Sequence, residues 1–246
     1  MALEPDLLII QKITETDAGT LDARATHWVG LQGRKGKAVF GFTDQPCVIA
    51  DSRPTDLRWF LPVQWNGFFI LASWAHVVTT SRRYVRVMLE ALDHYRPFLL
   101  ARPSIIIGDL NSNIVLDYKH RGKSHTDLVA RLDALEMSSA YHHGSVEAHG
   151  LESTPTFFLY RHREKPYHFD YAFGANGLLD DARLSRRRDR GLDRIERSPA
   201  VDPGSARPGA GIATVALPRL ASGRPLELAW RSINGAECCS AHPWLL

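Results

Sequence analysis

The segment SIIIGDLNSN, residues 104–113, decides how this sequence is interpreted. Its three consecutive isoleucines, residues 105–107, are typical of a strand buried on both faces. The strand ends in Gly-Asp-Leu-Asn, so Asp109 and Asn111 stand at its carboxyl end. Ligands of α/β proteins bind beyond the carboxyl ends of such strands. The segment therefore predicts a buried strand that delivers a carboxylate and an amide to a site.

The chemistry of these two side chains leaves two interpretations open. Asp109 can position or deprotonate a water molecule, or help to hold a hard cation through oxygen. Asn111 can donate its amide N–H to a phosphate oxygen. The alternative is an Asx-turn that closes the strand, and the residues by themselves favour this turn.

A second carboxylate lies inside an apolar strand. In YHFDYAF, residues 167–173, Asp170 stands between two aromatic residues. Burial of an unpaired charge is costly, so this carboxylate needs a partner. A hydrogen bond that orients a histidine is one solution and a structural salt bridge is another, and the residues do not choose between them.

A further buried strand stands near the start of the chain. In PDLLIIQK, residues 5–12, the apolar run 7–10 predicts a strand buried on both faces. This strand ends in Gln11 and Lys12. A lysine at the carboxyl end of a central strand is a ligand, a surface residue, or a replacement for another residue.

The remaining patterns predict a layered, partly antiparallel α/β protein. RWFLPVQWNGFFILASWA, residues 58–75, predicts a hairpin that turns at Asn66-Gly67. KGKAVFGF predicts an edge or half-buried strand, and STPTFFLY and YHFDYAFG predict neighbouring antiparallel strands. SRRYVRVMLEALDHYRPFLL predicts a helix that ends before Pro97, and SHTDLVARLDALEM predicts a helix capped by Ser124 or Thr126.

Composition places the chain among globular proteins of a reducing compartment. It has 246 residues and a formal net charge of +3, which permits a polyanionic partner without requiring one. Cys47, Cys238 and Cys239 provide neither a disulfide framework nor a metal-binding spacing. No signal peptide and no membrane-spanning stretch is visible, so the sequence predicts a cytoplasmic protein without membrane contact.

Five segments occur in an order that resembles a known family. PDLLIIQK, KGKAVF, SIIIGDLNSN, STPTFF and YHFDYAF are similar to segments of the endonuclease/exonuclease/phosphatase superfamily, the DNase I-like proteins. The similarity covers residues 2–176. It implies a four-layered α/β/β/α sandwich and hydrolysis of phosphodiester or phosphate-ester bonds with Mg²⁺ or Mn²⁺. The implied partner is a phosphate-ester substrate, with DNA or RNA as candidates.

The resemblance also implies roles for individual residues. Asp109 would position or activate the attacking water, and Asn111 would bind the scissile phosphate and stabilise charge that develops in the transition state. Asp170 would orient a catalytic histidine. Residues that would line the substrate groove are Thr156, Phe157, and Trp74 or His76.

Three departures from the family pattern predict that activity is impaired. The family strand that matches PDLLIIQ ends in Gln-Glu, and that Glu is the principal Mg²⁺ ligand, whereas Lys12 stands in its place here. Relatives begin with a further strand that precedes this segment, so the sandwich is predicted to be incomplete. Relatives also close with Ser-Asp-His; CSAHPWLL offers His242, but with Ala241 where the aspartate should be.

The composition divides the chain near residue 176. Residues 1–176 form the endonuclease/exonuclease/phosphatase-like domain without its first strand. Residues 177–246 are rich in Arg, Pro, Gly and Ala, and their composition predicts a divergent, disordered region in which GIATVAL is the exception. We interpret this composition as out-of-frame translation of GC-rich DNA, a hypothesis that resequencing of the locus would test.

Two further functional hypotheses stay open. One is a catalytically inactive remnant, or a domain that only binds phosphate or nucleic acid. The other is a different metallohydrolase built from YHHGSVEAHGLE, residues 141–152. This segment supplies several ligands for a borderline metal, but its spacing matches no familiar zinc motif and favours a surface loop. The candidate ligands are His142, His143, Glu147, His149 and Glu152.

Overall fold

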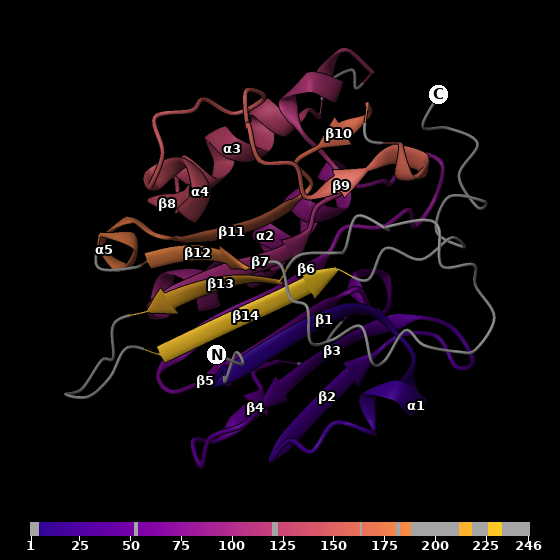
Figure 1. Cartoon of the computed structure of the whole chain (residues 1–246), viewed down its shortest axis with the longest axis vertical. Coiled ribbons are helices and arrows are strands. Elements are labelled where there is room, and N and C mark those ends of the chain that lie inside the picture. The colour runs from indigo at the N-terminus through magenta and orange to yellow at the C-terminus, as the bar shows by residue number, and fades with distance from the viewer. Residues whose placement is uncertain are drawn as a thin grey trace.

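The structure is a computed structural model that describes residues 5–51, 54–119, 123–162, 164–180, 183–187, 212–217 and 226–232. Within these residues two six-stranded sheets pack face to face. Helices cover the outer face of one sheet, and a short helix covers the other (Figure 1). The expected α/β/β/α order of layers is confirmed.

The first sheet has the strand order β12-β13-β14-β1-β3-β2. Its pairs are antiparallel except for β1 with β14, which is parallel. The strands are β1 (Leu7–Ile13), β2 (Ala25–Val29), β3 (Gly36–Gly41), β12 (Arg183–Arg187), β13 (Ile212–Leu217) and β14 (Leu226–Ser232).

The second sheet has the strand order β4-β5-β6-β7-β11-β8. Only the β6–β7 pair at its centre is parallel. The strands are β4 (Cys47–Ile49), β5 (Phe60–Trp65), β6 (Phe68–Trp74), β7 (Ser104–Asp109), β8 (Met137–Ser139) and β11 (Asp170–Ala175).

The helices are few and only two of those described are longer than four residues. They are α1 (Glu15–Ala18), α2 (Val85–Ala101), α3 (His125–Asp133), α4 (Ala140–His143) and α5 (Asn176–Leu179). In this part of the chain, no helix combines the length and apolar character that a membrane span requires. Short 3₁₀ turns cover Thr55–Leu57, Ile114–Lys119 and Leu159–Arg161.

Alternation along the strands builds the layers. In β1, Leu7 and Ile9 face the second sheet, whereas Ile10 faces the layer beneath α1. In β7, Ile105 and Ile107 face the first sheet and Ile106 packs under the long helices. Each such side chain contributes about 1.5–3 kcal/mol on burial, so both faces of these central strands favour the fold.

The Asn66-Gly67 hairpin is confirmed. Strands β5 and β6 pair antiparallel up to Trp65 and Phe68, and Asn66 and Gly67 have φ values of 48° and 82°. Two positive φ values match the twist of the flanking strands, which is why Asn-Gly is favoured there.

Helix α2 does not end before Pro97, so that expectation was wrong. The helix continues to Ala101 with Pro97 inside it. Pro97 removes the N–H that would bond the carbonyl of Asp93. Packing outweighs this loss, because Leu99 is buried and the Phe98 ring stacks on Phe69 of β6 at 5.4 Å.

The capping of α3 is resolved in favour of Ser124. Its side chain accepts a hydrogen bond from the N–H of Asp127, and the Asp127 carboxylate accepts one from the N–H of Ser124. This is a capping box, with an acidic residue at the third helical position. Thr126 lies inside the helix and is not the cap.

Two strand predictions need correction. Strand β3 is neither an edge strand nor half-buried: it lies between β1 and β2, and all six of its residues are buried. The segments STPTFFLY and YHFDYAFG pair only through β9 (Phe157–Phe158) and β10 (Pro166–Tyr167). The rest of YHFDYAFG forms β11, which joins the second sheet beside β7 instead.

The region after residue 176 contributes three strands to the first sheet. Strand β14 pairs with β1, and β13 and β12 extend the sheet beyond it (Figure 1). The GIATVAL strand is thereby confirmed as β13. The expected disorder of the remaining residues in this region, and His242 with it, lies outside the described residues.

Candidate functional site

The end of β1 turns two polar side chains toward the second sheet. The β1–β3 register shifts between Gln11 and Ile13, and Lys12 at the bulge has a φ of 62°. Gln11 donates a 2.6 Å hydrogen bond to the Ser73 carbonyl of β6. The Lys12 ammonium reaches Asp109 at the end of β7. The bulge therefore lets consecutive side chains point to the same side, as β-bulges commonly do near functional sites.

Lys12 and Asp109 form a buried ion pair. Nζ of Lys12 lies 3.3 Å from Oδ2 of Asp109, and each side chain is only 3% exposed. The Lys12 ammonium also lies 5.9 Å from the centre of the Phe157 ring. An ion pair this deep is screened little by salt. Lys12 is thus neither a surface residue nor a solvated cation.

Asp109 and Asp170 lie opposite each other across two central strands. They are partners in the antiparallel register of β7 and β11, and both are buried. The alternation of β11 puts Asp170 on the side of Ala172, which faces the first sheet, and Tyr171 on the outer side. Two carboxylates and one ammonium therefore meet at the same ends of the strands.

Asn111 closes the strand in the way that its Asx-turn interpretation predicts. Its N–H donates to Oδ1 of Asp109 at 2.9 Å, with a φ of 48°. Its side-chain amide donates to the carbonyl of Ala75 at 3.0 Å. The turn and the site are the same feature, because the turn places the half-buried Asn111 amide next to the Asp109 carboxylate.

Gly108 is required by the close approach of the neighbouring strand β6 and of the end of β1. Its φ is +142°, and a Cβ atom there would lie 1.9 Å from the Ser73 carbonyl oxygen and 2.2 Å from the Gln11 amide nitrogen. A side chain at this position would displace Gln11 from β6. The glycine of the GDLN segment therefore makes room for the end of β1.

Thr156, in the loop before β9, and Phe157, the first residue of β9, join this region. The Thr156 hydroxyl accepts hydrogen bonds from the N–H groups of Phe169 at 2.8 Å and Asp170 at 3.0 Å. Thr156 therefore fixes the start of β11, and Phe157 stands beside Lys12.

Trp74 and His76 lie at the end of the neighbouring strand β6. Trp74 is the register partner of Asp109 in the parallel β6–β7 pair. Its ring packs against Trp59 and His76, each at 5.1 Å, and His76 bonds through Nδ1 to the Val77 carbonyl. These contacts bring both residues to the same strand ends as Asp109, with Trp74 buried and His76 half-buried.

One buried residue beneath the site was missed by sequence reasoning. Lys37 of β3 is completely buried, and its ammonium donates to the carbonyl of Trp59 at 2.6 Å and to that of Ala72. It bridges the two sheets through the backbone of the second one. The signal was present, because a lysine inside KGKAVF interrupts an otherwise apolar buried strand.

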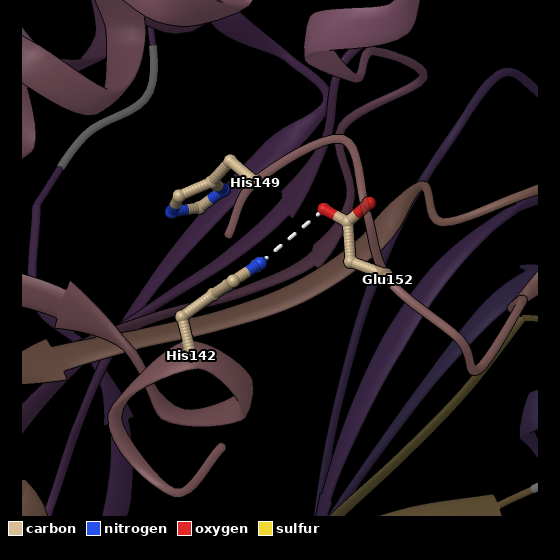
Figure 2. Close-up of side chains that lie close together, drawn as sticks. All are labelled: His142, His149 and Glu152. Atoms are coloured by element: carbon tan, nitrogen blue, oxygen red, sulfur yellow. Dashed lines mark ion pairs between the residues drawn. The ribbon is translucent and has the colours of Figure 1, made fainter. Parts of the chain in front are cut away.

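A second polar cluster lies on the outer side of β11. His142 of α4 faces Glu152 of the following loop, with 3.3 Å between Nε2 and Oε1, and the His149 ring stacks on His142 at 3.6 Å (Figure 2). Sequence reasoning named five candidate ligands in this segment, and these three come together. His143 instead contacts Asp180 at 3.1 Å.

Glu147, the fifth candidate, is occupied elsewhere in the same loop. Its carboxylate accepts hydrogen bonds from the Tyr141 hydroxyl and, at 3.0 Å, from the N–H of Ser153. Hydrogen bonds from Ser153 and Tyr141 lower the pKa of Glu147 to about 2. Glu147 therefore braces the loop and does not join the cluster.

Asn113 links this cluster to the GDLNSN segment. Its side-chain amide donates to both carboxylate oxygens of Glu152 at 3.1 Å, to the His168 carbonyl at 3.2 Å and to the Tyr171 hydroxyl at 2.9 Å. Burial raises the pKa of Glu152, but the contact with His142 and the hydrogen bonds from Asn113 and Gly150 outweigh it. The net pKa of Glu152 is lowered, so it is a carboxylate at neutral pH.

The neighbouring histidines are held in the neutral form. Burial, with the nearby charge of His142, lowers the pKa of His149 to about 4. Burial lowers the pKa of His125 to about 3, and its Nδ1 lies 2.9 Å from the Ser112 hydroxyl. Desolvation disfavours the imidazolium in both cases. This side of β11 is therefore rich in uncharged imidazoles.

Comparison with known proteins rests on structure. No protein-family model matches the sequence, and no curated protein matches it. The fold is similar to that of an AP endonuclease from Archaeoglobus fulgidus, with a TM-score of 0.56, 15% identity, and coverage of 88% of this chain and 90% of that one. A 3'-5' exonuclease from Neisseria meningitidis gives a TM-score of 0.54, 15% identity, and coverage of 87% and 89%.

A third similar structure is a 3' phosphatase from Neisseria bound to a product DNA hairpin. It has a TM-score of 0.51 and 13% identity, and the match covers 86% of this chain and 88% of that one. The two facing sheets and the helices outside them are the parts of the chain that this likeness of fold concerns. The chain has the fold of the endonuclease/exonuclease/phosphatase superfamily, the DNase I-like fold.

Proposed function

We propose that this chain binds phosphate esters, with nucleic acid as the preferred class, on a phosphodiesterase fold whose metal-dependent hydrolysis is impaired. The observation that carries this proposal is the buried ion pair between Lys12 and Asp109. By resemblance, the position of Lys12 belongs to a glutamate that holds the metal. Nucleic acid is favoured because one solved structure with this fold is a phosphatase bound to a DNA hairpin.

The residues present do not fit a Mg²⁺ or Mn²⁺ ion beside Asp109. Such ions take oxygen ligands, and an ammonium has no lone pair to offer. Two unit charges 4 Å apart repel by about 4 kcal/mol at an effective dielectric of 20, and a divalent ion doubles this cost. Since the Lys12 ammonium lies 3.3 Å from the Asp109 carboxylate, a cation there would have to displace it.

The same ammonium suits a phosphate. In our proposal, Lys12 supplies a fixed positive charge and the Asn111 amide donates a hydrogen bond to a phosphate oxygen. The Asn111 amide has two N–H donors, and the bond to Ala75 uses one of them. Phe157, Thr156, Trp74 and His76 would flank the bound ester.

Hydrolysis would be weak because the side chains that it requires are held in other contacts or are replaced by other residues. We propose that Asp109 would position a water only when Lys12 releases its carboxylate. Asp170 would orient a histidine, for which His242 is the candidate from the sequence. A catalytically inactive remnant that binds no phosphate ester is the alternative, and it differs from our proposal in binding.

The test combines binding and turnover on the full-length protein. Fluorescence anisotropy with labelled single- and double-stranded oligonucleotides measures binding in EDTA, and bis-p-nitrophenyl phosphate and plasmid DNA report hydrolysis in Mg²⁺ or Mn²⁺. We expect the native chain to bind without a metal and to hydrolyse more slowly than Lys12→Glu. Lys12→Met should weaken binding, because it removes the charge while keeping an unbranched side chain.

Lys12→Glu is the informative counterpart to Lys12→Met. It restores the carboxylate of the family pattern, so metal-dependent turnover should be higher than in Lys12→Met. Metal-dependent turnover of the native chain that equals or exceeds that of Lys12→Glu, and that Asp109→Asn abolishes, would show that hydrolysis is not impaired. Absence of binding to every oligonucleotide tested would favour the inactive remnant.

A further inference from the structure

Three side chains with metal-ligating atoms converge on the outer side of β11. One nitrogen each of His142 and His149 and one oxygen of Glu152 all lie within 4.8 Å of one another. His142 projects from α4 toward Glu152 of the following loop, and His149 of the same loop stacks its ring on that of His142 (Figure 2). We propose that these residues bind one borderline divalent cation, for which Zn²⁺ is the best match.

The donor set identifies the class of cation. Two imidazole nitrogens and one carboxylate oxygen are ligands of Zn²⁺, whereas Mg²⁺ and Ca²⁺ prefer oxygen alone. A tetrahedral ion with bonds of about 2.0–2.1 Å places its ligand atoms about 3.3 Å apart. His142 Nε2 and Glu152 Oε1 already stand 3.3 Å apart. Three protein ligands leave the fourth position to water, as in open zinc sites.

The nitrogen atoms of the cluster are placed to accept a ligand. Nδ1 of His149 is a buried atom without a hydrogen-bond partner among the described residues, and the buried Nε2 of His142 stands in its 3.3 Å contact with Glu152. The side chains of His142 and Glu152 are only 10% and 3% exposed. Buried polar atoms in folded proteins are normally satisfied, so the His149 nitrogen beside the His142–Glu152 pair calls for a further partner. A cation would serve all three groups at once.

Outer contacts hold two of the three ligands in place. The Glu152 carboxylate accepts hydrogen bonds from the Asn113 amide and, at 3.0 Å, from the N–H of Gly150. Nδ1 of His142 lies 2.9 Å from the Ser139 hydroxyl, which leaves Nε2 directed at Glu152. Metal-binding histidines commonly bond their second nitrogen in this way.

His149 is the ligand that must move. Its ring lies nearly parallel to that of His142, with 22° between the planes. Lone pairs of stacked rings do not converge on one point, so binding requires the His149 ring to turn out of the stack. His149 lies in a loop beside Gly150, whose φ of +88° is readily adopted only by glycine.

The site is separate from the Asp109 centre. The rings of Tyr171 and Phe173, which face the outer side of β11, pack against His149 at 6.2 and 6.5 Å. Asp109 and Asp170 lie on the side that faces the first sheet. An ion here would tie α4 to the loop that leads to Thr156. Its expected effect is therefore on structure, and its test does not depend on turnover.

The experiment measures the metal directly in the full-length protein. Protein stripped with EDTA and reloaded with Zn²⁺ is analysed for bound zinc, and Co²⁺ is used as a spectroscopic substitute. We expect about one zinc per chain, visible Co²⁺ absorption typical of a four-coordinate site, and a higher melting temperature with Zn²⁺. His149→Gln and His142→Gln should each weaken zinc binding by at least about 100-fold, since even loss of an outer contact costs about 10–100-fold.

The chain supplies matched controls. His143→Gln removes the adjacent imidazole, which contacts Asp180 instead, and should keep the zinc. Asp109→Asn should also keep it, which separates this site from the proposed phosphate-ester centre. Failure of the native chain to bind zinc would overturn the proposal, as would zinc that His149→Gln keeps and Asp109→Asn loses. If a variant does not fold, the Co²⁺ spectrum of the native chain still decides, because a spectrum without nitrogen ligation contradicts the assignment.

Discussion

At the scale of single residues, Lys12 combines two features that are individually uncommon. It is a buried lysine with a φ of 62°, a backbone conformation that costs a residue with a Cβ atom about 1–2 kcal/mol. The ion pair with Asp109 offsets this cost only while both partners are present. Replacing one partner of a buried pair is costly because the other charge remains buried and unpaired.

We therefore predict that Lys12→Met destabilises the protein by about 3–5 kcal/mol. Urea unfolding measures the change, and the Lys12→Met/Asp109→Asn double variant should lose less than the sum of the two single variants. The control is the exposed pair of Arg24 with Asp44, whose side chains are 64% and 84% exposed. Arg24→Met should change stability by less than about 1 kcal/mol. If Lys12→Met and Arg24→Met changed the free energy of unfolding equally, the buried role of Lys12 would be contradicted.

His125 predicts a dependence of stability on pH. The unfolded chain takes up a proton on this residue as the pH falls below 6.5, whereas the folded chain does so only near a pKa of about 3. The unfolded state then binds more protons, so the free energy of unfolding falls by up to about 1.4 kcal/mol per pH unit for this group. The stability is present above pH 6.5 and is lost progressively toward pH 3.

Urea unfolding of the native chain and of His125→Asn between pH 7 and pH 4.5 measures this contribution. The variant should show a shallower fall, because one depressed imidazole is removed. Some slope should remain, since the lowered pKa values of His149 and Glu152 act in the same direction. The charged or titratable groups whose electrostatic interactions act on the pKa of His125 are His149, Asp117, Glu152 and His142. An unchanged slope in His125→Asn would contradict the assignment.

At the scale of elements, patterns of adjacent residues correctly predicted the features that depend only on adjacent residues. The Asn66-Gly67 hairpin and the Ser124 cap depend on a few adjacent residues, and both are confirmed. The family resemblance predicted that Asp109, Asn111 and Asp170 belong to one site, and they lie together where β7 ends and the antiparallel β11 begins. The partner of Lys12 could not be predicted from the sequence, because the bulge that turns Lys12 toward Asp109 depends on how two distant segments pack.

Helix α2 shows where packing outweighs propensity. Pro97 is exposed inside the helix, yet the turn beyond it is held by Phe98 and Leu99 against the second sheet. We predict that Pro97→Ala stabilises the protein by about 1–2 kcal/mol, because it restores an N–H donor to the Asp93 carbonyl. Thermal unfolding measures the gain. Pro97→Gly should gain about 1 kcal/mol less, and a loss of stability in Pro97→Ala would show that the proline fits a kink that the packing requires.

At the scale of the whole molecule, the first sheet joins the first and the last strand of the described chain. Strand β14 pairs in parallel with β1 over five residue pairs, from Leu7 to Gln11. The division of the chain into two regions near residue 176 stays a prediction that rests on composition. The pairing of β14 with β1 determines which truncation tests it. A parallel pair between the first and last described strands is a contact of high sequence separation, which local patterns cannot reveal.

We predict that a chain truncated after Asp180 is not a stable monomer. Truncation removes β12, β13 and β14 and leaves β1 as an exposed edge with an apolar run. Size-exclusion chromatography should show association, and thermal unfolding should lose its cooperative transition relative to the full chain. A monomeric fragment with a sharp transition would instead support residues 1–176 as a self-sufficient domain.

The short segment from Asp109 to Asn113 has one further consequence. Its first residue faces Lys12, and its last residue holds Glu152 through the side-chain amide. Ligand binding at two sites that share five residues of backbone can be energetically coupled, because a shift at one end of the segment is transmitted through four peptide bonds to the other. If zinc on one side changes the affinity for a phosphate ester on the other, thermodynamic reciprocity requires the ester to change the affinity for zinc by the same factor. The stretch that decides the fold would then also connect the two ligands.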